Sequence, residues 1–364
     1  MARPTQEDAR ALRDWRPPLG VVSIYLRFDP SDRGGAWRTE LRNGLDRALE
    51  AAKEAEHERR LALRATVKRL AERFEDGERR PPPRGEAGFV EVAERPGTER
   101  WWQVGVPAAV PAMVRLDPEP VLAPLVELSC LAEPRGVALL SAERVRLLGF
   151  AEGGLEGIED WELSITSLDW RERKSPSARN PARAQNVGSS GHDQFGERLD
   201  HNRHRFLGEC GQLAGARLAE RGIREIVVFG PAVDLESFEA GIAPSGVRLA
   251  VGGDGDLIST PTGQLTEPVA AAIGRLCAEW DRALVERVLE AARGGSRGAA
   301  GAQETAAALA EGRVEHLVFD AAIGEPAEAL VRGALTGGSR ITVVRGEAAE
   351  PLASAEGAAA LLRY

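Results

Sequence analysis

The chain has 364 residues, of which 43% are apolar and 28% are charged, and its formal net charge is −9. This length is enough for two or three domains with hydrophobic cores, and the composition is that of an ordinary soluble globular protein. The negative charge argues against a protein that coats nucleic acid over its whole surface, although a single basic patch could still dock on RNA.

The spacing of the cysteines and the charge of the first residues indicate in which cellular compartment the protein is expected. Cys130, Cys210 and Cys277 lie far apart and form no CxxC pair, so neither a disulfide framework nor a cysteine zinc site is expected. The opening segment MARPTQEDARALRDW is charged and has no apolar core, unlike a signal peptide. Since no apolar run approaches membrane-spanning length, we expect a cytoplasmic protein that does not bind a membrane.

The first part of the chain predicts an α+β domain over residues 1–132. Residues 21–28 (VVSIYLRF) are β-branched and aromatic, which is typical of a strand. Apolar residues recur at helical spacing over 37–74, and the polar stretch KEAEHERR within them leaves open whether this is one helix or two. Two further strands are predicted, at residues 88–92 and 101–106.

The middle part, residues 133–262, predicts an α/β domain. The residues GVALLSAERVRLLGF favour two strands around a turn, and EIVVF is typical of a short buried strand. The predicted elements are strands within 136–150, a strand at 161–170, a helix at 195–221 and a strand at 225–229.

The last part, residues 263–364, predicts a compact α/β/α sandwich. A helix over 266–292 begins with Thr266 as a capping candidate and Pro268 in its first turn. The glycine-rich residues 294–301 are expected to form a flexible turn. Helices and strands then alternate, which favours the sandwich: helix 304–310, strand 314–319, helix 327–335 and strand 340–344.

A basic loop is expected at residues 171–195, with the sequence RERKSPSARNPARAQNVGSSGHDQ ending at Gln194. It has five basic and two acidic residues, a net charge of +3 in a chain of −9. A mobile segment of this kind suits entry into a phosphate-rich place. Its basic residues are Arg171, Arg173, Lys174, Arg179 and Arg183.

Three stretches near the C-terminus, ETAAALAEGRVEHLVFD, EALVRGALTGGSRITVV and GAAALLRY, resemble the last domain of Pelota and of the archaeo-eukaryotic class-1 release factors. That domain has a small α/β ribosomal-protein-like fold. The middle order of strand, loop ending in glutamine, long Arg-rich helix and VVFGP strand is similar to the release-factor catalytic domain. The opening VVSIYLRFDP resembles the bacterial branch. The chain thus resembles the bacterial archaeo-eukaryotic release-factor-like family, most closely from about residue 133 and more loosely before it.

The resemblance implies a functional site at the end of the basic loop. In class-1 release factors a Gly-Gly-Gln tip enters the peptidyl transferase centre and helps water to hydrolyse the ester joining peptide to tRNA. Here Gly191-His192-Asp193-Gln194 is G-x-x-Q, which resembles the variant in ribosome quality-control peptidyl-tRNA hydrolases. Gln194 would position the water and Gly191 would act as a hinge, with Gly188, His192 and Asp193 at the loop tip. An oriented water and a backbone donor for the developing oxyanion are sufficient for this chemistry.

The same resemblance implies which partners the protein binds. They are the ribosome, through large-subunit rRNA and peptidyl-tRNA, and a translational GTPase such as elongation factor Tu, which the last domain would contact. No cofactor is implied. The residues expected to contact RNA phosphates are Arg171, Arg173, Lys174, Arg179, Arg183, Arg198 and Arg203.

Two functions stay open at this point. The first is peptidyl-tRNA hydrolysis in ribosome rescue or quality control. The second is a non-catalytic rescue or hibernation factor that occupies the A site, because His192 and Asp193 add bulk where release factors have glycine, and Pelota has the same domain plan without the motif. A surface loop without a role is a further possibility. The first domain shows no stop-codon-reading motif, so codon-specific termination is not predicted.

Two other patterns suggest ligands less strongly. His201 and His204 are three residues apart and could face the same side of a helix, but a solvated helix face is the favoured interpretation and no metal site is predicted. The run Gly252-Gly253-Asp254-Gly255-Asp256 lacks the P-loop lysine and the calcium-ligand spacing, so we interpret it as a loop at a domain boundary.

Overall fold

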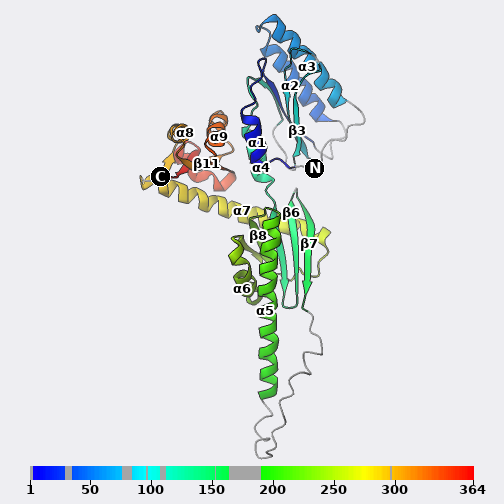
Figure 1. The fold of residues 1–364 in the computed structure, drawn as a ribbon, viewed down its shortest axis with the longest axis vertical. Coiled ribbons are helices and arrows are strands. Elements are labelled where there is room, and N and C mark those ends of the chain that lie inside the picture. Colours follow the sequence, from blue (N-terminus) through cyan, green and yellow to red (C-terminus); the bar gives the residue numbers. More distant parts are fainter. Residues whose placement is uncertain are drawn as a thin grey trace, which may run out of the picture. The chain divides into compact units, whose positions relative to one another are not determined.

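The computed structural model describes residues 3–28, 35–75, 84–95, 97–106, 112–151, 153–163, 190–295 and 297–364, with the backbone alone for residues 75 and 190–199. The chain divides into two compact units, one formed by Met1–Glu133 with Cys277–Tyr364 and the other by Pro134–Leu276. The described residues form three sheets, each packed against helices, which confirms the predicted α/β fold class (Figure 1). The division at residues 132 and 262 stays a proposal.

The first sheet is antiparallel and has the strand order β3-β2-β1-β4. Two helices, α2 and α3, cover one of its faces through apolar residues such as Leu41, Leu45, Leu63 and Leu70. The alternative of one long helix is therefore wrong. The elements are β1 (Val21–Arg27), α2 (Ala36–Ala51), α3 (His57–Glu75), β2 (Gly85–Glu91), β3 (Trp101–Val106) and β4 (Met113–Asp117).

The other face of the first sheet shares a core with the C-terminal residues of the same unit. Two helices that the sequence patterns did not predict, α1 (Gln6–Arg13) and α4 (Ala123–Leu131), contribute to this core. Leu12 and Leu125 pack in one cluster with Tyr25 of β1 and with Leu330 and Leu335 from the C-terminal part. Residues more than 300 positions apart therefore stabilise one another.

The C-terminal sheet has the order β10-β13-β11-β12, with β11 and β12 parallel. Leu317 and Phe319 face helices α8 and α9, whereas Val318 faces α7 and two 3-10 turns, so the predicted sandwich is confirmed. The elements are α7 (Thr262–Arg293), β10 (Gly298–Ala300), α8 (Ala302–Ala310), β11 (Val314–Asp320), α9 (Pro326–Gly337), β12 (Arg340–Val344), η3 (Gly346–Ala348), η4 (Glu350–Ala355) and β13 (Ala358–Leu362).

Two predictions for this region were wrong. The turn expected at residues 294–301 contains β10, which lacks β-branched residues and forms by pairing with β13. Helix α7 begins at Thr262, directly after Pro261, so Thr266 does not cap it and Pro268 lies inside the helix. Pro261 was the better signal for the start, because proline commonly precedes or opens a helix.

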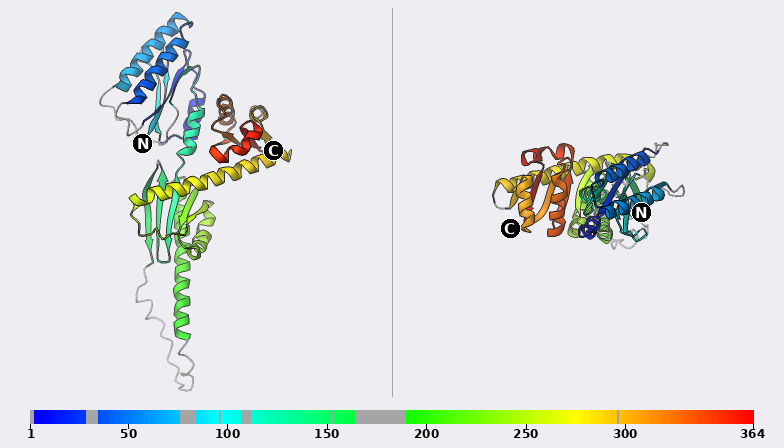
Figure 2. Two further views of the ribbon diagram at one scale, coloured as in Figure 1. Left: turned by 180° about the vertical axis from the view of Figure 1, so that it is seen from behind. Right: turned by 90° about the horizontal axis from the view of Figure 1, so that it is seen from above.

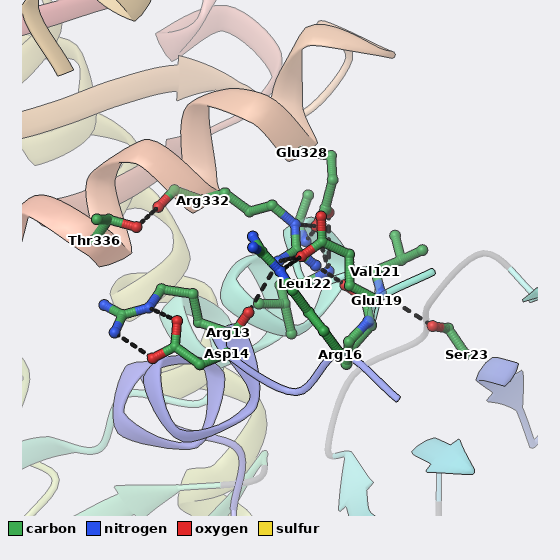
Figure 3. Close-up of polar contacts among 12 residues, drawn as sticks. Arg13, Asp14, Arg16, Ser23, Glu119, Val121, Leu122, Glu328, Arg332 and Thr336 are labelled. Carbon is green, nitrogen blue, oxygen red and sulfur yellow. Dashed lines mark hydrogen bonds and ion pairs between the residues drawn. The ribbon is translucent and has the colours of Figure 1, made fainter. Parts of the chain in front are cut away.

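A polar network joins α9 to the start of α4 (Figure 3). Helix α4 has no cap from its own N-cap residue, Leu122. Instead, the Glu328 carboxylate of α9 accepts hydrogen bonds from the backbone N–H groups of Leu122 at 2.9 Å and Ala123 at 2.8 Å. Arg332 donates to Glu328 at 2.9 Å and to Glu119 at 2.8 Å. Charged acceptors at helix starts are favourable, so this network stabilises both helices.

The second unit is built on a five-stranded sheet with the order β7-β6-β5-β8-β9. Strands β5, β8 and β9 are parallel, and β6 and β7 continue the sheet as antiparallel strands. Helices α5 and α6 pack on one face. The elements are β5 (Arg135–Ser141), β6 (Arg144–Ala151), β7 (Gly154–Glu162), α5 (Ser190–Glu220), β8 (Glu225–Phe229), α6 (Ala232–Ile242), η2 (Ala243–Ser245) and β9 (Arg248–Gly253).

The beginning of α7 lies on the opposite face of this sheet (Figure 2). Arg146 of β6, whose neighbours Val145 and Leu147 face α5, points the other way and donates to the carbonyl oxygens of Ile258 and Thr260 at 2.9 and 2.8 Å. The sheet is therefore covered on both faces, as expected for parallel strands.

Two further boundaries differ from the prediction. Strand β7 covers Gly154–Glu162, so the strand expected at 161–170 shares only Trp161 and Glu162 with it, because the hairpin with β6 pairs Arg144 with Glu162. Gly252 and Gly253 end β9 rather than belonging to a loop. A bulky residue would not fit at Gly252, where a Cβ would lie 2.5 Å from the Phe229 ring.

Candidate functional site

The predicted G-x-x-Q motif lies at the start of α5. The helix begins at Ser190, five residues earlier than predicted, so the backbone of Gly191, His192, Asp193 and Gln194 is helical and does not belong to a loop. An acidic residue in the first turn favours a helix start, and Asp193 has that position. The prediction of a loop as far as residue 195 is corrected to this extent.

The second half of α5 is fixed on the sheet by one apolar stripe. Leu207, Cys210, Ala214 and Leu218 recur at steps of three or four residues and are at most 2% exposed. They pack against strand residues of β5, β6 and β8 and against α6. Leu218 fits over Gly136 of β5, where a Cβ would lie 2.8 Å from its side chain. This half of the helix is therefore held in one position.

Close backbone contact with α6 further restricts α5. A Cβ added to Gly211 would lie 2.3 Å from the Phe238 carbonyl oxygen, and one added to Gly241 would lie 2.1 Å from the Gly208 carbonyl oxygen. These distances are far below any normal contact, so glycine is needed where the helices cross. Gly208, Gly211 and Gly215 recur at helical spacing, a signal that the sequence interpretation missed.

The first half of α5 forms a helical arm, which we define as residues 190–205. Among its residues with described side chains, 200–205, none is buried. Because an α-helix rises about 1.5 Å per residue, Ser190 lies about 25 Å along the axis from Leu207. Figure 1 shows the start of α5 extending beyond the ends of the strands. The packed half of α5 is thus anchored on the sheet, and the backbone of the motif lies at the far end of the arm.

Arg203, one of the predicted RNA contacts, is engaged within the protein. Its guanidinium lies 3.0 Å from the Glu143 carboxylate of the β5–β6 turn and 3.7 Å from the Asp200 carboxylate. Since these carboxylates compensate its charge, Arg203 is a weaker candidate for a phosphate contact than the sequence indicated. It connects the arm to the sheet instead.

His204 and Asp234 continue this contact between α5 and α6. The His204 Nδ1 lies 2.7 Å from the Ser237 hydroxyl, which ties this imidazole to α6. Burial raises the pKa of the Asp234 carboxyl, and the positive charges of Arg203 and His204 act in the opposite direction. Within the residues whose side chains are described, no group of three or more His, Cys, Asp or Glu residues could hold a metal ion.

Of the remaining predicted residues, the structure describes the backbone of one and none of the others. The backbone of Arg198 lies on the arm together with the motif. The residues that fall outside the described part of the chain are Arg171, Arg173, Lys174, Arg179, Arg183 and Gly188. Their roles stay predictions. No helix in the described part of the chain is long and apolar enough to span a membrane.

The part of the chain that contains α5 matches a known protein family. Residues 120–293 match the family described as bacterial archaeo-eukaryotic release factor family 10, and this range contains the whole of α5 and the five-stranded sheet. The match covers slightly less than half of the chain and confirms, for that part, the resemblance to release factors drawn from the sequence. No curated protein matches the chain.

Several solved structures are similar to the chain at low identity. The archaeal translation termination factor aRF1 is 19% identical, with 99% of this chain and 97% of that chain covered and a TM-score of 0.27. Archaeoglobus fulgidus Pelota is 14% identical, with 77% and 79% covered and a TM-score of 0.33. S. cerevisiae Dom34, described as a translation termination-like factor that interacts with Hbs1, is 11% identical, with 77% and 80% covered and a TM-score of 0.41.

Proposed function

We propose that this protein binds the ribosome and hydrolyses peptidyl-tRNA in ribosome rescue or quality control, with Gln194 positioning the attacking water. The observation that carries the proposal is the family match over residues 120–293, which includes the motif and the helix that bears it. The arm supports the proposal, because a helix fixed at one end can bring a small motif into a narrow site.

The chemistry requires few groups from the protein. Water attacks the ester carbonyl carbon and the bond to the tRNA 3′ oxygen breaks. One proton of the water goes to that oxygen and the other to solvent, leaving a peptide carboxylate and a free tRNA 3′ hydroxyl. The first four N–H groups of a helix lack acceptors within the helix. Since α5 begins at Ser190, one residue before the motif, these N–H groups are candidate donors for the developing oxyanion.

Partners follow from the same proposal. The basic residues before α5 would contact rRNA or tRNA phosphates, and binding would then weaken as salt rises. The C-terminal sandwich would contact a translational GTPase such as elongation factor Tu. The proposed partners of this chain are therefore ribosome-bound RNA and a translational GTPase.

The decisive experiment is release of labelled peptide from peptidyl-tRNA on purified ribosomes and on isolated large subunits. The native chain is compared with Gln194→Ala and with the control Gln212→Ala, which removes an exposed glutamine from the packed half of the same helix. Sedimentation measures binding in parallel. We expect the native chain and Gln212→Ala to release peptide and Gln194→Ala to bind without release. Equal release by Gln194→Ala would contradict the catalytic role of Gln194.

A second function is favoured by one observation. His192 and Asp193 replace the glycines of the release-factor tip, and the backbone there is helical. A helical backbone with two larger side chains is compatible with a factor that occupies the A site, for rescue or hibernation, without cleaving the ester. Binding by all three proteins with no release by any of them would establish this function instead.

A further inference from the structure

One edge strand from each of the three sheets shows a different degree of protection. Unpaired edge strands can recruit another strand, and proteins usually cover them or charge them. The edge strand β12 is covered: Gln6 of α1 donates to the Ile341 carbonyl oxygen at 2.9 Å, and Cys130 of α4 lies beside it. The edge strand β7 carries four carboxylates, on Glu156, Glu159, Asp160 and Glu162.

Strand β4, one of the two edge strands of the first sheet, has backbone groups that could pair with a partner strand. Hydrogen bonds from Val92 to Gly20 and from Phe28 to Arg84 show that the even-numbered residues of β1 bond to β2. The odd-numbered residues of β1 therefore bond to Met113, Arg115 and Asp117 of β4. The N–H and C=O groups of Val114 and Leu116 consequently point away from β1, and the described turns and loops contribute no backbone bond to either residue.

A groove of about 410 Å³ runs beside this edge. Small side chains of α2 and the turn after it leave the space open, since its floor consists of Ala48, Ala51, Ala52 and Ala55. Val114 to Asp117 form the strand side of the groove. The five residues of β4 span about 17 Å, a length that suits an added strand of about five residues.

The groove is basic although the protein is acidic. Arg47, Arg59 and Arg115 line it, with Asp117 as the single carboxylate of the lining. Arg115 pairs with Asp117 at 2.8 Å, and Arg59 donates to the Leu19 carbonyl oxygen at 3.2 Å. A guanidinium has five N–H donors, so these bonds leave donors for a carboxylate of a ligand.

We propose that this groove binds an extended, acidic segment of a partner protein, which pairs with Val114 and Leu116 as an additional strand beside β4. The backbone bonds would supply affinity, and the three arginines would select acidic side chains. This inference is independent of the proposed peptidyl-tRNA hydrolysis, because it concerns a different part of the chain and a protein partner.

The test uses the full-length chain and a fluorescent peptide of sequence Val-Glu-Val-Asp-Val-Glu, with binding measured by fluorescence anisotropy. Two control peptides replace the acidic residues by lysine or carry N-methyl groups on alternate residues, which removes one hydrogen-bonding edge. We expect salt-sensitive binding of the acidic peptide alone. Hydrogen exchange should slow at the amides of Val114 and Leu116 when it binds.

Protein variants separate charge from backbone pairing. Arg115→Glu is expected to weaken binding about tenfold, whereas the control Arg64→Glu, an exposed change on α3 outside the groove, should stay within about twofold. Leu116→Pro removes an outward N–H and no bond to β1, so it should fold and lose binding. Equal binding of the N-methylated peptide, absence of binding, or preference for an oligouridylate over the acidic peptide would overturn the proposal.

Discussion

Two helix contacts in this molecule are built by opposite means. In the unit formed by Pro134–Leu276, α5 and α6 approach so closely that Gly211 and Gly241 touch the backbone of the facing helix. In the other unit, α4 receives its cap from Glu328 of α9, and Arg332 holds that carboxylate in place. The first contact depends on shape and the second on charge and hydrogen bonds.

The difference teaches which changes each contact tolerates. A contact of backbone against backbone leaves no space for a methyl group, but it does not depend on pH or salt. A contact made by charged side chains can accept small changes in shape, although it weakens when one partner is removed. The helix that carries the candidate site is held by the first kind, so its direction should be insensitive to solution conditions.

The largest effect is expected from filling the glycine contact. Gly211→Ala should lower the free energy of unfolding of its unit by about 3 kcal/mol, because the new methyl group would overlap the Phe238 carbonyl oxygen and force α6 to move. Gly241→Ala should act similarly through Gly208. Urea denaturation, with hydrogen exchange in β8 as the local probe, measures the loss.

The control for this prediction is Gly274→Ala in α7. Gly274 is helical and exposed, and an added Cβ would meet nothing within 4 Å. Alanine favours the helix over glycine by about 1 kcal/mol, so this change should be neutral or stabilising. A similar loss of stability in both variants would mean that close contact with α6 is not the cause.

A smaller effect, which depends on pH, is expected on the stability of the unit formed by Met1–Glu133 with Cys277–Tyr364. Burial, with Arg340 and Arg287 nearby, lowers the pKa of His316 to about 4, and its Nε2 lies 2.8 Å from the Thr342 hydroxyl. An unfolded histidine titrates near a pKa of about 6.5, so the unfolded chain binds the proton first as the pH falls. Stability from the neutral ring is complete above about pH 6.5 and should fall by about 2 kcal/mol by about pH 4.5.

This pH effect is measured as the free energy of unfolding of that unit at several pH values between neutral and acid. His316→Gln should remove the additional acid sensitivity, while His57→Gln, a change at an exposed position of α3, should leave it unchanged. Identical pH profiles for the native chain and His316→Gln would contradict the assignment.

The smallest effect is expected at the α4–α9 contact. Arg332→Ala should lower the free energy of unfolding by about 1.5 kcal/mol, because it removes the partly buried guanidinium that pairs with both Glu119 and Glu328 and leaves Glu119 with an exposed arginine alone. Arg16→Ala is the matched control: Arg16 also contacts Glu119, but its side chain is 69% exposed, so the loss should stay below about 0.5 kcal/mol. Denaturation of both variants in parallel measures the difference. Equal losses would show that burial of the pair is unimportant.

Sequence patterns predicted the strands well where the signal is local. The runs WWQVGV, EIVVF and RITVV became β3, β8 and β12 at their predicted bounds, since β-branched and aromatic residues bounded by polar ones are typical of strands. The order of elements in the C-terminal sandwich was also correct.

Elements that depend on distant partners were missed. Helix α4 is largely apolar and has no single polar face, because it packs against α1, α9 and β12, so its sequence lacks the usual periodicity. Strand β10 forms only because Ala358–Leu362 lies beside it. For the candidate site, the sequence identified the motif but ended the loop at residue 195, since glycine and serine near Ser190 favour a turn when considered alone.

The arm sets the direction in which the motif faces around the helix axis as well as its distance from the sheet. Each helical residue turns the chain by about 100°, so one residue inserted within 200–205 would leave the packed half of α5 in place and rotate the motif by that angle. Four inserted residues would restore the facing direction to within about 40° while moving the motif about 6 Å outward. Insertions of different length in this segment thus separate the direction in which Gln194 faces from the distance that it reaches.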